Sequence, residues 1–202
     1  MATSNNSKYR QMEHIKHIKE LPDTYVGSSI SEEKELYVYE NEKIKKNTIN
    51  WVPALYKIFD EIIVNAVDNH TRTKREKEKF PKKMIRVMSK LEVNIDKELG
   101  VISVLNDGEG IEIKQIDTEK KKGIYVIELI FGELLTSENF KDGTEKKVTG
   151  GKNGYGAKLT NIFSDWFTVE SVDRKQKLLY TQTWTENMEK KSDPIITEYN
   201  VC

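Results

Sequence analysis

One amphipathic segment, FDEIIVNAVDNHTR, carries a stripe of polar residues whose types could serve a binding site. Glu61, Asn65, Asp68, Asn69 and Arg72 recur at the three- and four-residue spacing that places side chains on one helix face. Such a stripe is most often the solvated side of a helix. Here two of its members are asparagines, which are poor helix formers, and apolar residues border it closely. We therefore predict that the stripe faces a cavity lined by carboxylate and amide groups.

A second candidate is VLNDGEGI, residues 104–111, in which a strand pattern runs into Asn-Asp-Gly-x-Gly. An Asp-Gly pair is a strong signal for an ordinary hairpin turn, and that interpretation stays open. The functional interpretation is that the glycines let a ligand approach the backbone. The carboxylate at the end of the strand would then accept hydrogen bonds from a flat polar ring.

The third candidate is TGGKNGYGAKLTNIF, residues 149–163, in which four glycines precede an amphipathic run. A glycine-rich backbone can turn successive N–H groups toward an anion, and a helix that begins there adds its positive end. Gly151 and Gly156 have the spacing of a P-loop. However, Lys158 arrives one residue late, and Leu159 stands where a metal-binding hydroxyl belongs. A flexible lid that closes over phosphates fits the segment better.

These segments need elements that position them, and the pattern along the chain is mixed rather than regularly alternating. Helical spacing predicts helices over 53–74, 124–135 and 157–164, with a weaker one over 8–21. Alternation predicts strands over 35–40, 47–52, 84–95, 100–107, 165–172, 178–186 and 194–201. The charge run 72–83 reads as a solvated helix end and loop. The expected fold class is α+β.

Composition excludes several classes of protein. The 202 residues include 33 Lys and Arg against 33 Asp and Glu, so no global positive field is available for DNA binding. The best candidate for a local DNA contact is the basic patch from Lys77 to Arg86. The single cysteine, Cys202, excludes a disulfide framework, and no apolar run is long enough for a membrane span. We expect an intracellular, reducing compartment.

The three motifs, taken in their order along the chain, resemble the GHKL ATPase superfamily, which includes gyrase-like topoisomerases, heat-shock-90 chaperones, histidine kinases and mismatch-repair MutL proteins. The segments PDTYVGS, KIFDEIIVNAVDN, IFGELLTSENF and KKVTGGKNGYGAKLTNIFS are similar to the ATPase domain of type IIA DNA topoisomerases of the eukaryotic and large-virus branch. The resemblance implies a Bergerat fold, in which helices cover one face of a mixed or antiparallel sheet. It also implies a strap over 1–21 and an ATPase domain over 22–202.

Site roles follow from this resemblance. It implies that Glu61 is the general base that activates water against the γ-phosphate of ATP, that Asn65 is a Mg²⁺ ligand, and that Asp107 reads the adenine amino group. The walls of the pocket around the adenine ring would be formed by Ile111, Ile130 and Phe131. The other residues implied to contact the nucleotide are Asn69, Arg72, Thr136, Ser137, Asn139, Gly151, Lys152, Asn153, Gly154, Tyr155, Gly156, Ala157 and Lys158.

The resemblance also implies partners. Tyr9 would lie on the strap and reach the nucleotide of a partner subunit, although a mobile N-terminal aromatic residue is the alternative. ATP binding would stabilise a homodimer and close a gate behind a captured DNA segment. DNA would be engaged through the full-length enzyme, in the nucleus or in a viral or host compartment where DNA is replicated.

The family's transducer and DNA-cleavage domains have no counterpart in these 202 residues, so we expect the chain to be an N-terminal piece that binds ATP, hydrolyses it slowly and cannot relax DNA alone. Two alternatives stay open. One is a catalytically silent nucleotide-binding dimerisation module. The other is a different GHKL ATPase of the chaperone or mismatch-repair type.

Overall fold

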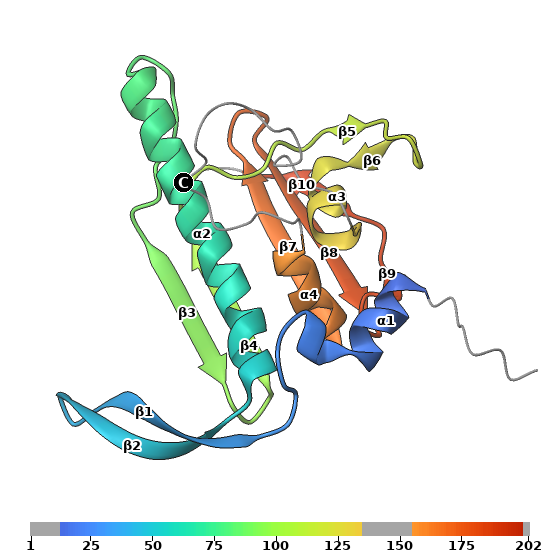
Figure 1. Cartoon of the computed structure of the whole chain (residues 1–202). Helices are drawn as coiled ribbons and strands as arrows, with labels where there is room; N and C mark the ends of the chain where they lie inside the picture. Colours follow the sequence, from blue (N-terminus) through green and yellow to red (C-terminus); the bar gives the residue numbers. More distant parts are fainter. Residues whose placement is uncertain (1–12, 135–154, 200–202) are drawn as a thin grey trace, which may run out of the picture. The chain divides into compact units, whose positions relative to one another are not determined.

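The computed structural model describes residues 13–134 and 155–199. The chain divides into two compact units, Met1–Tyr56 and Lys57–Cys202, which are described separately (Figure 1). None of the helices in the described ranges combines the length and apolar character needed to cross a lipid bilayer. The predicted division into a strap over 1–21 and an ATPase domain over 22–202 stays a prediction.

The described part of the first unit, residues 13–56, contains two short helices and a long hairpin. Its elements are α1 His14–Glu20, η1 Pro22–Thr24, β1 Glu32–Glu40, β2 Lys43–Trp51 and the start of α2. His17 Nδ1 lies 3.0 Å from the Tyr25 hydroxyl, which ties α1 to the residue after η1. The hairpin turns at Asn41 and Glu42, both with positive φ, as the two-residue turn that matches strand twist requires. The strand predicted over 47–52 begins earlier, because residues 43–46 also pair with β1.

The second unit combines helices with antiparallel strand pairs, so the predicted α+β class is confirmed. The long helix α2 Pro53–Lys79 enters it from the first unit. The remaining elements are β3 Leu91–Asp96, β4 Val101–Asn106, β5 Gln115–Ile116, β6 Ile124–Tyr125, α3 Val126–Gly132, α4 Gly156–Ile162, β7 Trp166–Asp173, β8 Leu178–Thr185, β9 Lys190–Lys191 and β10 Ile195–Glu198. Among the described residues β3 pairs with β4 and β5 with β6, while β8 pairs with β7, β9 and β10.

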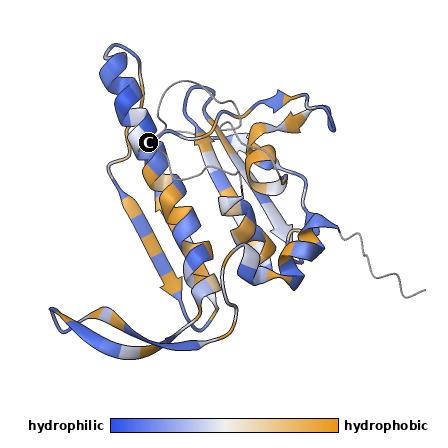
Figure 2. Ribbon diagram, viewed as in Figure 1, coloured by the Kyte–Doolittle hydropathy of each residue, from blue (hydrophilic) through white to orange (hydrophobic). Residues whose placement is uncertain are grey.

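Two expectations about element bounds were wrong. The helix predicted over 124–135 is shorter, because Ile124 and Tyr125 pair with β5 before α3 begins. The strand predicted over 84–95 begins only at Leu91, since the backbone N–H groups of Ser89 and Lys90 donate to the carboxylate of Asp107 instead of to a strand. Figure 2 shows the hydrophobic alternation of β3 that remains.

The core of the second unit lies where α3 and α4 pack against each other and against β7 and β8. Ile127 and Ile162 are fully buried, and burial of such a side chain contributes about 1.5–3 kcal/mol. A Cβ added to Gly132 would lie 2.6 Å from Trp184 Nε1, so α3 can approach β8 this closely only with glycine there. This packing fixes α4, and with it one side of the candidate site.

Candidate functional site

The start of α4 lies directly over the polar stripe of α2. A Cβ added to Gly156 would overlap Glu61 Oε2 and would lie 3.6 Å from Asn65 Nδ2. The Thr160 hydroxyl donates to the Ile58 carbonyl at 2.7 Å and anchors α4 to the preceding turn of α2. The side chain of Glu61 is only 16% exposed. Glu61 is therefore enclosed, as predicted for the stripe. Position 156 requires glycine because a side chain there would overlap the Glu61 carboxylate.

Sequence reasoning missed one neighbour of this carboxylate, Lys57. Its ammonium forms an ion pair with Glu61 one turn along α2, and hydrogen bonding to Glu61 raises the pKa of Lys57 above its ordinary value, with burial opposing. The four-residue spacing of the two residues was a signal that could have found the pair. Among the described residues, Glu61 thus has one cationic neighbour and one glycine neighbour.

Asn69 links α2 to the Asp-Gly-x-Gly segment. Its Nδ2 donates to the carbonyl of Glu109 at 3.0 Å, whereas its Oδ1 is buried and has no hydrogen-bond partner among the described residues. A buried acceptor without a donor is costly and rare in native proteins. Asn69 Oδ1 is therefore suited to accept a hydrogen bond from a bound molecule.

Asp107, expected to read a flat polar ring, is held by four donors. Its carboxylate accepts hydrogen bonds from the Ser89 hydroxyl at 2.7 Å, the Ser89 and Lys90 backbone N–H groups at 2.8 Å each, and Arg86 Nη2 at 3.1 Å. The Ser89 hydroxyl and these backbone groups hold the pKa of Asp107 well below its usual range, with Arg86 adding to the effect. A carboxylate has about four acceptor positions, so a ring amine must share or replace one donor. Sequence reasoning missed these donors because residues 84–90 were predicted as strand.

The Asp-Gly-x-Gly segment runs beside the end of β7 and does not turn back as a hairpin. Ile111 N donates to Ser171 Oγ at 3.0 Å, and Ile113 N donates to Asp173 Oδ2 at 3.1 Å. A Cβ added to Gly110 would overlap the carbonyl oxygen of Val172. The ordinary hairpin turn is therefore excluded. The glycines were predicted to let a ligand approach the backbone. At Gly110 it is strand β7, through the Val172 carbonyl, that approaches the backbone.

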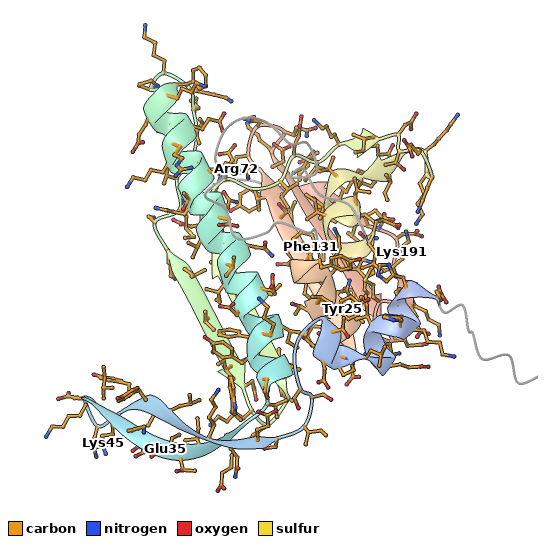
Figure 3. All side chains as sticks on the ribbon, in the orientation of Figure 1. Tyr25, Glu35, Lys45, Arg72, Phe131 and Lys191 are labelled. Carbon is orange, nitrogen blue, oxygen red and sulfur yellow. The ribbon has the colours of Figure 1, made fainter. Side chains whose placement is uncertain are left out.

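The third side of the site comes from α3 and α4. Phe131 packs 6.1 Å from the Phe167 ring, and its carbonyl accepts a hydrogen bond from Asn161 Nδ2 at 3.1 Å (Figure 3). Lys158, on α4, is only 3% exposed, and burial lowers the pKa of its amine to about 8, with the charge of Glu133 opposing. A buried ammonium of this kind is stabilised by an anion. Ile130 lies beside Phe131 on α3, and it is half-buried.

Not all predicted residues are brought together. Tyr155, Gly156 and Ala157 lie at the start of α4, where Gly156 is beside Glu61. Arg72 is exposed on α2, one turn beyond Asn69 (Figure 3), and no contact with the other site residues is described. The predicted residues outside the described ranges are Tyr9, Thr136, Ser137, Asn139, Gly151, Lys152, Asn153 and Gly154.

The side chains around Glu61 offer few oxygen ligands for a Mg²⁺ ion. The described residues contain no group of three or more His, Cys, Asp and Glu that could hold a metal ion by themselves. Mg²⁺ keeps several waters and is often held through phosphates with one or two protein oxygens. The exposed amide of Asn65, beside Glu61, is compatible with such a site.

Known proteins share this arrangement of elements and sequence. No protein-family model matches the chain. It is 47% identical over 198 residues to DNA topoisomerase 2 of Penicillium chrysogenum and 49% identical over 191 residues to probable DNA topoisomerase 2 of Dictyostelium discoideum. These matches cover 97% and 95% of the chain. The crystal structure of the ATPase region of Saccharomyces cerevisiae topoisomerase II superposes with a TM-score of 0.84 at 43% identity, over 96% of the chain.

The chain belongs to the type II DNA topoisomerase family. It corresponds to part of the nucleotide-binding ATPase region of these enzymes, so the expected family and the Bergerat fold class are confirmed. The chaperone and mismatch-repair alternatives are not supported. The chain spans 12% of the length of each of the two curated topoisomerases and 48% of the yeast chain.

Proposed function

We propose that this topoisomerase chain binds ATP with Mg²⁺ and hydrolyses it, and that it serves as the nucleotide-operated gate of a type II DNA topoisomerase. The observation that carries the proposal is the approach of Gly156 to Glu61 and Asn65. It brings the end of the glycine-rich segment to Glu61, a carboxylate of the stripe whose side chain is only 16% exposed. A catalytic carboxylate and a phosphate-binding segment must meet in this way for hydrolysis.

Each described residue has a chemical task in this proposal. Glu61 orients a water molecule and accepts its proton, because phosphoryl transfer depends mainly on position and charge neutralisation. Lys158 supplies a positive charge for the phosphates, while Asp107 and the side chains of Ile111, Ile130 and Phe131 select the base. Mg²⁺, held by Asn65, would neutralise charge on the phosphates.

The wider role is proposed on the same footing. In the full-length enzyme, ATP binding would stabilise a homodimer and close a gate behind a DNA segment. Tyr9 would contribute to the nucleotide site of the partner subunit. We propose that the protein acts where DNA is replicated, in the nucleus or in a viral or host compartment.

Replacement of Glu61 by alanine tests the catalytic proposal. Slow hydrolysis by the wild-type chain should be measured with radiolabelled ATP at high protein concentration, and nucleotide affinity by fluorescence of a labelled analogue. Glu61→Ala should lower the hydrolysis rate by about 10²- to 10⁴-fold and leave affinity within about threefold. Asp60→Ala, one residue away on α2, is the control. It should change neither the hydrolysis rate nor the nucleotide affinity. Equal rates for wild type and Glu61→Ala would instead indicate a catalytically silent binding module.

A further inference from the structure

Two segments of this chain carry a marked local excess of positive over negative charge. Residues 72–90 contain nine lysines and arginines but two glutamates, and residues 174–177, the turn between β7 and β8, add three more cations. Because the whole chain has 33 residues of each sign, the remaining residues together are net acidic. A balanced total charge therefore conceals a strongly uneven distribution.

The fold brings these segments together. The Lys83 ammonium hydrogen-bonds to Glu76, and the pKa of that carboxyl is lowered first by this bond and further by the charges of Lys83, Arg72 and Lys175. Lys175 Nζ lies 3.6 Å from Glu109 Oε1, whose other oxygen accepts a hydrogen bond from Arg86 N at 3.0 Å. Figure 2 shows the hydrophilic far end of α2. We call the joined segments 72–90 and 174–177 the basic surface.

Most carboxylates around the basic surface are already paired. Glu76 pairs with Lys83, Asp107 with Arg86 and Glu109 with Lys175, while Glu78 is exposed. Several cations remain exposed without an ion pair to any described residue. They are Arg72, Lys74, Arg75, Lys79, Lys82 and Lys177. This leaves a net positive surface that can neutralise an external polyanion.

Several of these cations lie on helix α2 or on the loop that is hydrogen-bonded to it. Arg72, Arg75 and Lys79 follow one face of α2 at spacings of three and four residues and span about 10 Å of the helix axis. The loop after α2 is fastened to it, because Lys77 Nζ donates to the Lys83 carbonyl at 2.8 Å. About 10 Å corresponds to roughly three phosphates along one strand of duplex DNA.

We propose that the basic surface binds the phosphate backbone of duplex DNA. The choice of DNA over other polyanions rests on the proposed function, since a type II topoisomerase handles duplexes. The surface offers mainly lysine and arginine charges, which neutralise phosphates whatever the bases, so we expect the contact to be independent of base sequence. Arg72 belongs to the stripe and residues 86–90 hold Asp107, so the test below leaves these residues unchanged to separate DNA binding from nucleotide binding.

The test uses fluorescence anisotropy of a labelled 30-base-pair duplex with the full 202-residue chain at several salt concentrations. The variant Arg75→Gln/Lys79→Gln/Lys82→Gln/Lys177→Gln should weaken DNA binding at least tenfold and reduce the magnitude of the salt slope by about 3. The control Lys43→Gln/Lys45→Gln/Lys120→Gln/Lys122→Gln removes the same charge from exposed lysines elsewhere and should remain within about twofold of wild type. Two duplexes of unrelated sequence should bind equally.

Several results would overturn the inference. These are absence of DNA binding by the wild-type chain, equal loss in the control variant, and displacement of DNA by polyglutamate at equal charge, which would indicate an acidic protein partner. Nucleotide affinity is measured in parallel for all three proteins. If the wild-type chain binds DNA but not nucleotide, the proposed function is refuted and the basic surface is not. If it binds nucleotide but not DNA, the basic surface is refuted and the proposed function is not.

Discussion

Glu61 and Asp107 are both carboxylates on the predicted nucleotide site, yet their surroundings differ sharply. Among the described residues, Glu61 has one ion pair, with Lys57, and the bare backbone of Gly156 beside it. Asp107 accepts four hydrogen bonds from a loop that is remote in sequence. One carboxylate keeps acceptor positions for an incoming molecule, while the other is held rigidly by the protein.

The difference fits two kinds of task. A general base must accept a proton from water, so it needs an unused lone pair close to the reacting atoms. A carboxylate that selects a ligand by shape gains from being fixed and ionised in advance, because a fixed group loses little entropy on binding. Three predictions test whether this contrast is real.

The largest effect is expected from Gly156→Ala, which places a methyl group against Glu61. Displacement of the carboxylate or of α4 should lower ATP hydrolysis about 100-fold and destabilise the chain by about 1–3 kcal/mol. Hydrolysis assays and denaturant unfolding measure both effects. In a Glu61→Ala background the stability loss should shrink, because the overlapping atoms are absent. Strictly additive losses would show that Gly156 and Glu61 do not meet.

An intermediate effect is expected from Asp107→Asn, and it should depend on pH. The folded pKa of Asp107 is lowered from an ordinary value of 3.8, so its stabilising effect is present above pH 4 and disappears as the pH falls through that value toward the folded pKa. At pH 7 the variant should melt about 3 °C or more below wild type, and Ser89→Ala, which removes one donor, should have a smaller effect. The difference between the melting temperatures, followed by circular dichroism from pH 7 to pH 3, should begin to narrow below about pH 4. A gap that stays constant with pH would contradict the assignment.

The smallest effect is expected from Lys57→Met. The lysine is 42% exposed, and solvent-exposed ion pairs at this helical spacing contribute no more than about 0.5 kcal/mol. Lys16→Met breaks the matched pair of Lys16 with Glu20 on α1 and should be equally mild in denaturant unfolding. A loss above about 2 kcal/mol at Lys57 alone would mean that Glu61 is held as firmly as Asp107.

Local pattern was sufficient for much of the site. The helical period placed Glu61, Asn65 and Asn69 on one face of α2, and the strand before Asp107 was predicted from alternation. Contacts between distant segments were not predictable in this way. The donors from residues 86–90 to Asp107 are about 20 residues away in sequence, and the overlap of Gly110 with β7 depends on tertiary packing. The shortened α3 reflects a strand pair that no local window shows.

The buried amine of Lys158 has a consequence for how this site responds to its medium. With a pKa of about 8, this amine would be uncharged in part of the molecules near neutral pH. Any anion that settles beside it favours the charged form, so loading of the site takes up hydrogen ions from solution. Modest alkalinisation should therefore weaken the binding of an anion beside Lys158.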